Sequence, residues 1–328
     1  MAMKTNKQTY TFIDLFAGLG GFHIALESLG CKCVFTSELK EDLRQLYKLN
    51  FPDVPLIEGD ITKVDLTTIP HHDILCAGFP CQAFSISGSR KGFNDSRGIL
   101  FFDVARIAKE KQPKILFLEN VKNLEVHDNR KTFEIMKNTL DDIGYDVYSK
   151  VLDSAEYGSP QSRKRIYIVC FRKDLGIKNF EFPTPFQKHK YVKDILCQEN
   201  ADKYVINRED IIVSKDDTKM KCDTKPIRIG IVNKGGQGER IYSPKGKGIT
   251  LSAYGGGVGA KTGLYKIDGK VRKLSPRECA RMQGFPDDFK IADKDTVAYK
   301  QFGNSVVIDV LQQIVLQITN NEDVMKCL

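Results

Sequence analysis

Two reactive side chains follow short apolar runs of the sequence, and together they could perform covalent catalysis. Cys81 stands in the segment 78–82 (GFPCQ), directly after the apolar run 73–77. Glu119 follows a later run, 115–118. A thiolate near backbone N–H groups and cations is a nucleophile, and a carboxyl group beside it can donate a proton. We therefore interpret Cys81 and Glu119 as a nucleophile and proton-donor pair.

A basic segment, 161–165 (QSRKR), precedes a further apolar run and could supply fixed positive charge to the same site. Each of these features alone also has a structural interpretation: a buried cysteine, a helix-capping glutamate and a solvated basic loop. The carboxyl ends of parallel strands, however, share one edge of a sheet, where such folds bind ligands. The coincidence of all three features at that edge favours a catalytic site.

A glycine-rich segment, 14–21 (DLFAGLGG), lies between a predicted strand and a predicted helix. Its glycines allow a tight turn and the close approach of a ligand, although many α/β proteins use such a loop only for packing. Glu38 comes 20 residues after Gly18, where an acid can accept hydrogen bonds from ribose hydroxyls. Asp60 could receive an adenine amino group. An adenosine-type cofactor is therefore predicted. The loop lacks the full G-x-G-x-x-G order, which slightly disfavours a dinucleotide. Both NAD and S-adenosylmethionine remain alternatives at this point.

Short apolar runs alternate with amphipathic segments of helix length along most of the chain. Strands are predicted at 10–15, 33–37, 73–77, 115–118, 151–155 and 166–171, and helices include 21–29 and 305–318. This alternation indicates an α/β fold, a doubly wound and mostly parallel sheet with helices on both faces. The last helix has an apolar side, so the chain is expected to return to its first domain. The predicted domains are 1–189 completed by 275–328, with 190–274 inserted as a smaller second domain.

The inserted segment is basic and rich in glycine. Residues 190–270 contain 16 Lys or Arg and 10 Asp or Glu, within a chain whose net charge is +8. Twelve of the 26 glycines fall between positions 230 and 269. This composition indicates short strands and loops that bring the backbone close to a polyanion, or alternatively a solvated loop insertion.

Length and composition exclude several classes of protein. A chain of 328 residues is long enough for two domains at roughly 150 residues each. No apolar run approaches the roughly 20 residues of a membrane span, and the polar N-terminus resembles no secretory signal, so a cytoplasmic protein is expected. The nine cysteines contain no CxxC pair and the five histidines are scattered. No disulfide framework and no metal site are expected.

The ordered motifs of the chain resemble those of the cytosine-C5 DNA methyltransferases. The resemblance rests on DLFAGLGG (14–21), GFPCQAFS (78–85), ENV (119–121), QSRKR (161–165) and FGNSV (302–306). It includes KGGQGERIYS (234–243) and ITLSAYGGG (249–257) of the inserted segment and so covers essentially the whole chain. It implies a Rossmann-like methyltransferase fold whose inserted domain recognises the target. The implied enzyme transfers a methyl group to DNA from S-adenosyl-L-methionine, which leaves as S-adenosyl-L-homocysteine.

The resemblance also assigns catalytic roles. Cytosine C5 is too weak a nucleophile to take a methyl group directly. Cys81 would attack C6, Glu119 would protonate or hydrogen-bond N3, and Arg165 would hold O2. C5 would then attack the methyl group, a base such as water would remove the C5 proton, and Cys81 would leave by elimination. Arg163 would support Glu119 and the Cys81 loop, and the target cytosine would be flipped out of the duplex.

The residues implied in binding form two sets. The cofactor set is Phe16, Leu19, Gly20, Glu38, Leu39, Asp60, Ile61, Pro80, Leu100, Asn304 and Val306. Leu39 departs from the family, which has a tryptophan stacked on adenine there, and the loss of that stack is worth roughly 0.5–1.5 kcal/mol. The DNA set is Ser87, Gln237, Arg240, Thr250, Tyr254 and Gly257. Ser87 and Gln237 would enter the space left by the flipped base, with Gln237 pairing to the orphaned guanine. Arg240 would read a guanine edge in the major groove.

Three alternatives remain beside DNA methylation. The same fold and the Cys/Glu pair also serve tRNA methylation, and a catalytically idle DNA-binding protein would need only the basic region. An NAD-dependent oxidoreductase would need a hydride-transfer site that the sequence does not offer. The match of the inserted segment favours double-stranded DNA, with GCGC as the expected site and its inner cytosine as the target. A monomer is expected, with a restriction endonuclease in the same system.

Overall fold

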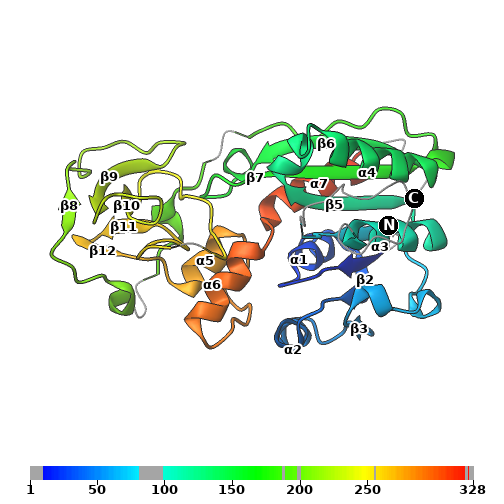
Figure 1. The fold of residues 1–328 in the computed structure, drawn as a ribbon, viewed down its shortest axis with the longest axis horizontal. Coiled ribbons are helices and arrows are strands. Elements are labelled where there is room, and N and C mark those ends of the chain that lie inside the picture. Colours follow the sequence, from blue (N-terminus) through cyan, green and yellow to red (C-terminus); the bar gives the residue numbers. More distant parts are fainter. Residues whose placement is uncertain are drawn as a thin grey trace, which may run out of the picture. The chain divides into compact units, whose positions relative to one another are not determined.

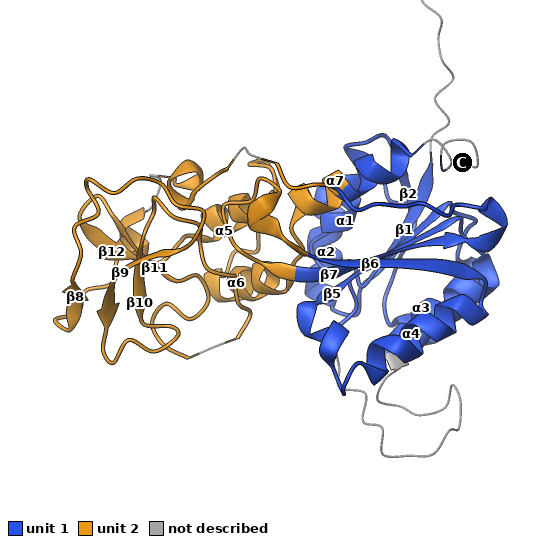
Figure 2. Ribbon diagram, turned by 90° about the horizontal axis from the view of Figure 1, so that it is seen from above, with its two compact units in different colours: residues 1–151, 165–183, 314–328 blue, residues 152–164, 184–313 orange. Residues whose placement is uncertain are grey.

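The computed structural model describes residues 10–80, 99–186, 189–197, 201–254, 256–321 and 324. The chain divides into two compact units (Figures 1 and 2). The first unit comprises Met1–Val151, Arg165–Pro183 and Ile314–Leu328, and the second comprises Leu152–Lys164 and Thr184–Gln313. The second unit thus extends beyond the segment 190–274 that composition singled out, since it also takes in 152–164 and most of 275–328.

The first unit is built on a seven-stranded sheet in the order β3-β2-β1-β4-β5-β7-β6. The strands are β1 (Thr11–Leu15), β2 (Lys32–Ser37), β3 (Ile57–Glu58), β4 (Ile74–Ala77), β5 (Ile115–Val121), β6 (Tyr145–Asp153) and β7 (Lys164–Arg172). Along the sheet, β3, β2, β1, β4 and β5 run parallel to one another, whereas β7 runs antiparallel to β5. The predicted doubly wound, mostly parallel sheet is therefore confirmed. Its order reverses between β1 and β4, the switch point beside which such sheets bind ligands.

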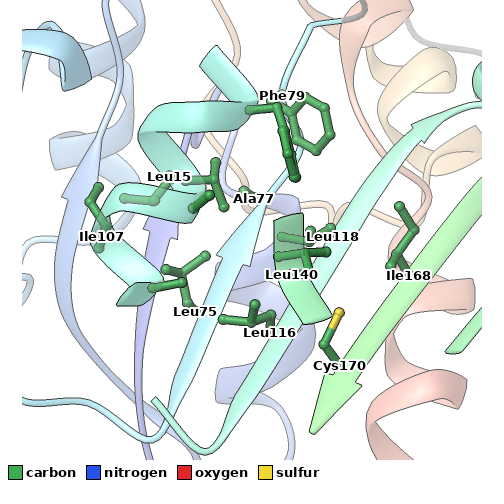
Figure 3. Packing of buried hydrophobic residues seen from close by; sticks show 14 of the residues in the cluster. Leu15, Leu75, Ala77, Phe79, Ile107, Leu116, Leu118, Leu140, Ile168 and Cys170 are labelled. Atoms are coloured by element: carbon green, nitrogen blue, oxygen red, sulfur yellow. The ribbon is translucent and has the colours of Figure 1, made fainter. Parts of the chain in front are cut away.

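Helices pack on both faces of this sheet. They are α1 (Gly21–Glu27), α2 (Glu41–Asn50), α3 (Ile99–Lys111) and α4 (Lys131–Asp142). The helix α7 (Ile308–Thr319) is divided between the two units, and its residues from Ile314 on belong to the first. Leu116 and Leu118 of β5 join the buried cluster that includes Ile107 of α3 and Leu140 of α4 (Figure 3). Phe117 points to the opposite face, as alternation along a strand requires, and meets Phe22 of α1 edge to face at 5.1 Å between ring centroids.

The second unit contains a five-stranded sheet in the order β12-β11-β10-β9-β8. Its elements are β8 (Ile211–Val213), β9 (Ile227–Val232), β10 (Arg240–Ser243), β11 (Leu264–Ile267), β12 (Lys270–Arg272), α5 (Pro276–Met282) and α6 (Asp295–Asn304). Ile229, Ile241 and Leu264 form the centre of a small buried cluster. Arg272 and Glu278 make a fully buried ion pair at 2.7 Å, which ties β12 to α5. The short strands and glycine-rich loops expected of this segment are present.

Short 3₁₀ helices complete the fold. They are η1 (Ile61–Lys63), η2 (Leu66–Thr68), η3 (Lys122–Val126), η4 (Ser154–Glu156), η5 (Lys173–Leu175), η6 (Val192–Ile195) and η7 (Ala201–Tyr204). Within the described ranges, no helix is both long enough and apolar enough to cross a membrane.

A buried histidine on α1 makes the first unit sensitive to acid. His23 stacks on Phe51 at 3.9 Å between ring centroids, and its Nδ1 lies 2.8 Å from the Tyr47 hydroxyl. Burial lowers the pKa of His23 from 6.5 to about 4. The unfolded chain therefore binds a proton that the native state does not, over the range from pH 6.5 down to about 4. Stability falls as the pH falls through this window.

We expect His23→Phe to reduce the slope of unfolding free energy against pH by about 1.2 kcal/mol per pH unit between pH 6 and 5. Urea unfolding at several pH values measures this slope. His71→Phe is the matched control, because His71 is an exposed histidine. Equal slopes in wild type and His23→Phe would show that His23 does not carry this proton linkage.

Candidate active site

The glycine-rich loop after β1 is held in strained backbone conformations. Phe16 has φ 57°, a left-handed value that is a genuine outlier for a bulky residue, and Gly18 and Gly20 have φ 54° and 77°. A Cβ on Gly20 would come within 2.4 Å of the Phe51 ring, so only glycine fits there. Strain of this kind is concentrated at functional sites, which fits the prediction that Phe16, Leu19 and Gly20 contact a cofactor.

Glu38 is fixed against this loop. Its carboxylate accepts hydrogen bonds from the backbone N–H groups of Gly18 and Lys40, each at 3.0 Å. The spacing of 20 residues between Gly18 and Glu38 thus corresponds to a direct contact across the ends of β1 and β2. The carboxylate is held in one orientation and keeps further acceptor capacity, because each of its oxygens has two lone pairs.

Asp60 lies two residues after β3 and caps the N-terminus of η1. Its carboxylate accepts hydrogen bonds from the Thr62 backbone N–H at 3.1 Å and from the Thr62 hydroxyl at 2.8 Å. These bonds hold the pKa of Asp60 below its usual value, so the group is an ionised acceptor. Ile61 and Leu19, by contrast, are 3% and 4% exposed, and Ile61 belongs to the sheet core.

The turn after Glu38 presents an apolar side chain to solvent. Leu39 is 68% exposed. Arg44 of α2 reaches this turn, and its Nη1 donates to the carbonyl oxygens of Glu38 at 2.8 Å and Leu39 at 2.7 Å. No sequence pattern points to Arg44, because donation to backbone carbonyls leaves no spacing motif.

Asp14, the first residue of the segment 14–21, has no role that the sequence predicts. It is fully buried in β1, and neither carboxylate oxygen has a hydrogen-bond partner among the described residues. Burial raises the pKa of this carboxyl well above its usual value. This carboxyl group lies behind the glycine-rich loop, where its ionised form would be costly.

These residues suit an adenosine-containing cofactor. A fixed carboxylate, an ionised Asp60 and an exposed leucine gather at the carboxyl ends of β2 and β3, beside the glycine-rich loop. Pro80 is exposed after β4, and Leu100 in the first turn of α3 is half-buried. Asn304 and Val306 belong to the second unit, and their place in the cofactor site stays a prediction.

Glu119 and Arg165 form an ion pair at the edge where catalysis was predicted. Glu119 lies in β5, is 7% exposed, and its Oε1 is 3.1 Å from Arg165 Nε. The strand register explains the contact. Arg165 of β7 pairs with Val121, two residues beyond Glu119 on the same face of the sheet. Both predicted catalytic residues are therefore brought together, and Arg165 lies inside β7 rather than in a loop before it.

The segment that leads to Cys81 is attached to the same strand. Asn120 Nδ2 donates to the carbonyl oxygen of Phe79 at 2.9 Å, and both residues are buried. The end of β5 is thus tied to residue 79, two positions before the predicted nucleophile. Cys81 itself and Ser87 lie outside the described residues.

Arg163 has a different environment from Arg165. It is 2% exposed and donates to the carbonyl oxygens of Leu251 at 3.0 Å, Gly303 at 3.1 Å and Ser305 at 2.7 Å. It therefore fixes the segments that carry Thr250 and Asn304. The neighbouring Gln161 assists, because its Oε1 accepts from the Leu251 N–H at 3.2 Å. The expected support of Glu119 by Arg163 stays a prediction.

We expect Arg163→Met to lower the free energy of unfolding by about 3 kcal/mol, because three buried carbonyls lose a charged donor. Chemical denaturation measures this change. Lys164→Met is the control, since Lys164 is the exposed next residue and should cost little. If the two variants are equally stable, Arg163 does not hold these segments in place.

Several of the predicted DNA-binding residues surround one hollow of the second unit. Gln237, Tyr254 and Gly257 line a cavity of about 370 Å³ together with Gly236, Gly238, Glu239, Ser252, Gly256 and Ala260. Arg240 is exposed at the start of β10. The Thr250 hydroxyl donates to the Ser162 carbonyl oxygen at 2.6 Å. The glycines that line this cavity leave backbone groups accessible to a ligand.

Within the described part of the chain, no three His, Cys, Asp or Glu side chains are grouped so as to hold a metal ion. The described cysteines are free thiols.

Comparisons with known proteins match nearly the whole chain. The family described as C-5 cytosine-specific DNA methylase matches residues 10–320, which include parts of both units. The chain is 56% identical over 308 residues to the type II methyltransferase M.HhaI of Haemophilus parahaemolyticus, with 94% of this chain and 93% of that protein covered. It is 43% identical over 328 aligned residues to the type II methyltransferase M.HpaII of Haemophilus parainfluenzae, with 93% and 88% covered.

Solved structures share the fold at lower identity. The S. pombe Dnmt2 methyltransferase aligns with a TM-score of 0.74 at 20% identity and covers 93% of this chain and 97% of its own. The Entamoeba histolytica methyltransferase EhMeth aligns with a TM-score of 0.73 at 19% identity, with 96% and 99% covered. At such identities the likeness establishes the α/β architecture.

Proposed function

The chain belongs to the C-5 cytosine-specific DNA methylases, and on this basis we propose that it methylates the inner cytosine of duplex GCGC, using the residues assigned below. The enzyme is a DNA (cytosine-5-)-methyltransferase, and its family implies S-adenosyl-L-methionine as the methyl donor. The observation that carries the residue assignment is the ion pair of Glu119 and Arg165 on β5 and β7, next to the segment that leads to Cys81.

The ring of the target cytosine is too electron-poor for C5 to attack a methyl group directly. Attack by the Cys81 thiolate on C6 places an electron pair in the ring and makes C5 nucleophilic. Glu119 donates a proton or a hydrogen bond to N3, which accepts the displaced electrons. When bound, S-adenosyl-L-methionine supplies the electrophilic methyl group and leaves as S-adenosyl-L-homocysteine. Removal of the C5 proton by a base, for which we propose water, then expels Cys81 from C6 and restores the aromatic ring.

Arg165 supports both partners in this step. Its Nε holds Glu119 Oε1 at 3.1 Å, so the carboxyl group has a defined orientation within a mostly buried strand. A guanidinium offers five N–H donors in a rigid fork, so the group can bind cytosine O2 as well. The positive charge stabilises the negative charge that develops on the ring during attack at C6.

The second unit supplies recognition of double-stranded DNA. A base in a duplex stack cannot be reached by Cys81, so the cytosine must be flipped out. We assign Gln237 and Ser87 to the space that the flipped base leaves in the duplex. Tyr254 and Gly257 form walls of the protein cavity that Gln237 also lines. The exposed Arg240 can donate two hydrogen bonds to guanine O6 and N7. Thr250, held against Ser162, contacts the DNA through backbone or base.

The site GCGC is supported by the resemblance of 234–243 and 249–257 to the DNA-reading segment of the family. The test is bisulfite sequencing of a plasmid expressed with the protein in a host free of cytosine methylation. We expect 5-methylcytosine at the inner cytosine of nearly every GCGC. Arg240→Gln should reduce discrimination at one guanine, whereas Arg208→Gln, an exposed arginine paired with Asp210, should not. Methylation in another sequence context would overturn the GCGC assignment.

The relatives with high identity are named type II methyltransferases. We therefore place the enzyme in a restriction-modification system whose endonuclease cleaves the unmodified site without forming a stable complex with it. The enzyme acts on DNA in the bacterial cytoplasm as a monomer, because one subunit flips one base, and it needs no metal ion for the steps above.

A further inference from the structure

Leu39 is the adenine contact that the resemblance implies, and we propose that Arg44 is the positioning residue that holds Leu39 for that contact. The inference rests on the proposed function, since it takes S-adenosyl-L-methionine as the ligand. It explains how a chain without tryptophan closes this part of the cofactor site.

Leu39 stands in the right place to be that contact. It follows Glu38, whose fixed carboxylate suits the ribose hydroxyls, and its side chain is 68% exposed. A single exposed leucine usually needs no explanation. The backbone of Leu39, however, is held by one guanidinium, which binds both its own carbonyl and the preceding carbonyl.

Arg44 holds the turn after β2 and lies close to Gly59, which follows β3. Its Nη1 donates to both the Glu38 and Leu39 carbonyls, and its Nη2 pairs with Glu41. The same Nη1 lies 3.4 Å from the position that a Cβ on Gly59 would occupy. The guanidinium therefore lies between the turn after β2 and the residue before Asp60. These are the two strand ends that an adenosine would contact.

The ribose-binding acid does not depend on Arg44. The Glu38 carboxylate is held by the N–H groups of Gly18 and Lys40, whereas Arg44 binds only the Glu38 carbonyl. Removing the guanidinium should thus loosen Leu39 and leave the carboxylate in place. The loss of affinity should then pass through Leu39, which makes the proposal testable by a double-mutant cycle.

The experiment is isothermal titration of S-adenosyl-L-homocysteine into the DNA-free protein and its variants. We expect Leu39→Ala and Arg44→Ala each to weaken binding by about 3- to 10-fold, which corresponds to the loss of one apolar contact. The double variant should bind about as well as the weaker single variant. Leu39→Trp should strengthen binding by about 3- to 10-fold, because an aromatic stack replaces an alkyl contact.

Two controls separate this role from a general loss of structure. Leu49 belongs to α2, the helix that carries Arg44, and its side chain is 69% exposed. Leu49→Ala should leave the affinity unchanged. Thermal midpoints of the ligand-free variants and their affinity for DNA should also match the wild type. Arg44→Lys provides a second variant, which keeps the charge but not the two-carbonyl geometry, and it should bind weakly as Arg44→Ala does.

The outcomes are distinguishable. If the wild type binds S-adenosyl-L-homocysteine and Leu39→Ala and Arg44→Ala bind it with the same affinity, this inference is overturned and the proposed function is not. Additive losses in the double variant would show that Arg44 acts independently of Leu39 and would overturn its positioning role. Absence of binding by the wild type would overturn the proposed cofactor, and with it this inference.

Discussion

Cys81→Ala is expected to abolish methyl transfer, a loss of at least about 10⁴-fold, while binding to the target duplex is retained. The reason is that the proposed mechanism needs a bond from Cys81 to C6 before C5 becomes nucleophilic. The measurements are single-turnover transfer of labelled methyl groups and equilibrium binding to a duplex with one GCGC site. Cys222→Ala is the matched control, since Cys222 is an exposed thiol of the second unit.

A duplex with 5-fluorocytosine at the target position makes the same test covalent. Fluorine cannot leave C5 as a proton does, so elimination of the cysteine is blocked and the protein stays attached to the base. The wild type and Cys222→Ala should form this adduct, and Cys81→Ala should not. Turnover or adduct formation by Cys81→Ala would contradict the assignment of Cys81 as the nucleophile.

The second large effect is expected for Glu119→Gln, which should lower the rate of methyl transfer by about 10²–10⁴-fold, the usual contribution of a general acid. The amide keeps the size of the side chain but cannot give N3 a proton, and it leaves Arg165 without its anionic partner. Rapid-quench measurement of the chemical step isolates this effect from binding.

Glu125→Gln is the control for that substitution, because Glu125 is an exposed carboxylate in the short helix η3 that follows β5. It should transfer methyl groups at the wild-type rate. A Glu119→Gln variant within about tenfold of wild type would mean that N3 is activated by another group.

The sequence patterns that predicted strands correctly were continuous apolar runs. Strands β1, β4 and β5 are buried on both faces, so their composition alone reveals them. The strand β6 was predicted at 151–155, but it begins at Tyr145 and ends at Asp153. It is the outermost strand of the sheet, and its partly exposed middle lacks an apolar run. The last helix begins at Ile308 rather than at residue 305, because Ser305 instead gives its carbonyl to Arg163.

The parts of the candidate site that depend on chain spacing were predictable. The distance of 20 residues between Gly18 and Glu38 pointed to one shared site, and the two residues are hydrogen-bonded to each other. The binding of ribose hydroxyls by Glu38 stays a prediction. The contact between Glu119 and Arg165 needed the register of β5 against β7, which no spacing reveals. The roles of Arg44 and Arg163 were hidden for another reason, since both donate to backbone carbonyls and any residue type can supply that acceptor.

The most direct test of the proposed function is methyl transfer from labelled S-adenosyl-L-methionine to unmethylated genomic DNA and, in parallel, to total tRNA. Mass spectrometry then identifies the labelled nucleoside. The proposed function predicts labelled 5-methylcytosine in DNA and none in tRNA. Label confined to tRNA would contradict the DNA substrate, and a folded protein that labels neither would contradict catalysis itself.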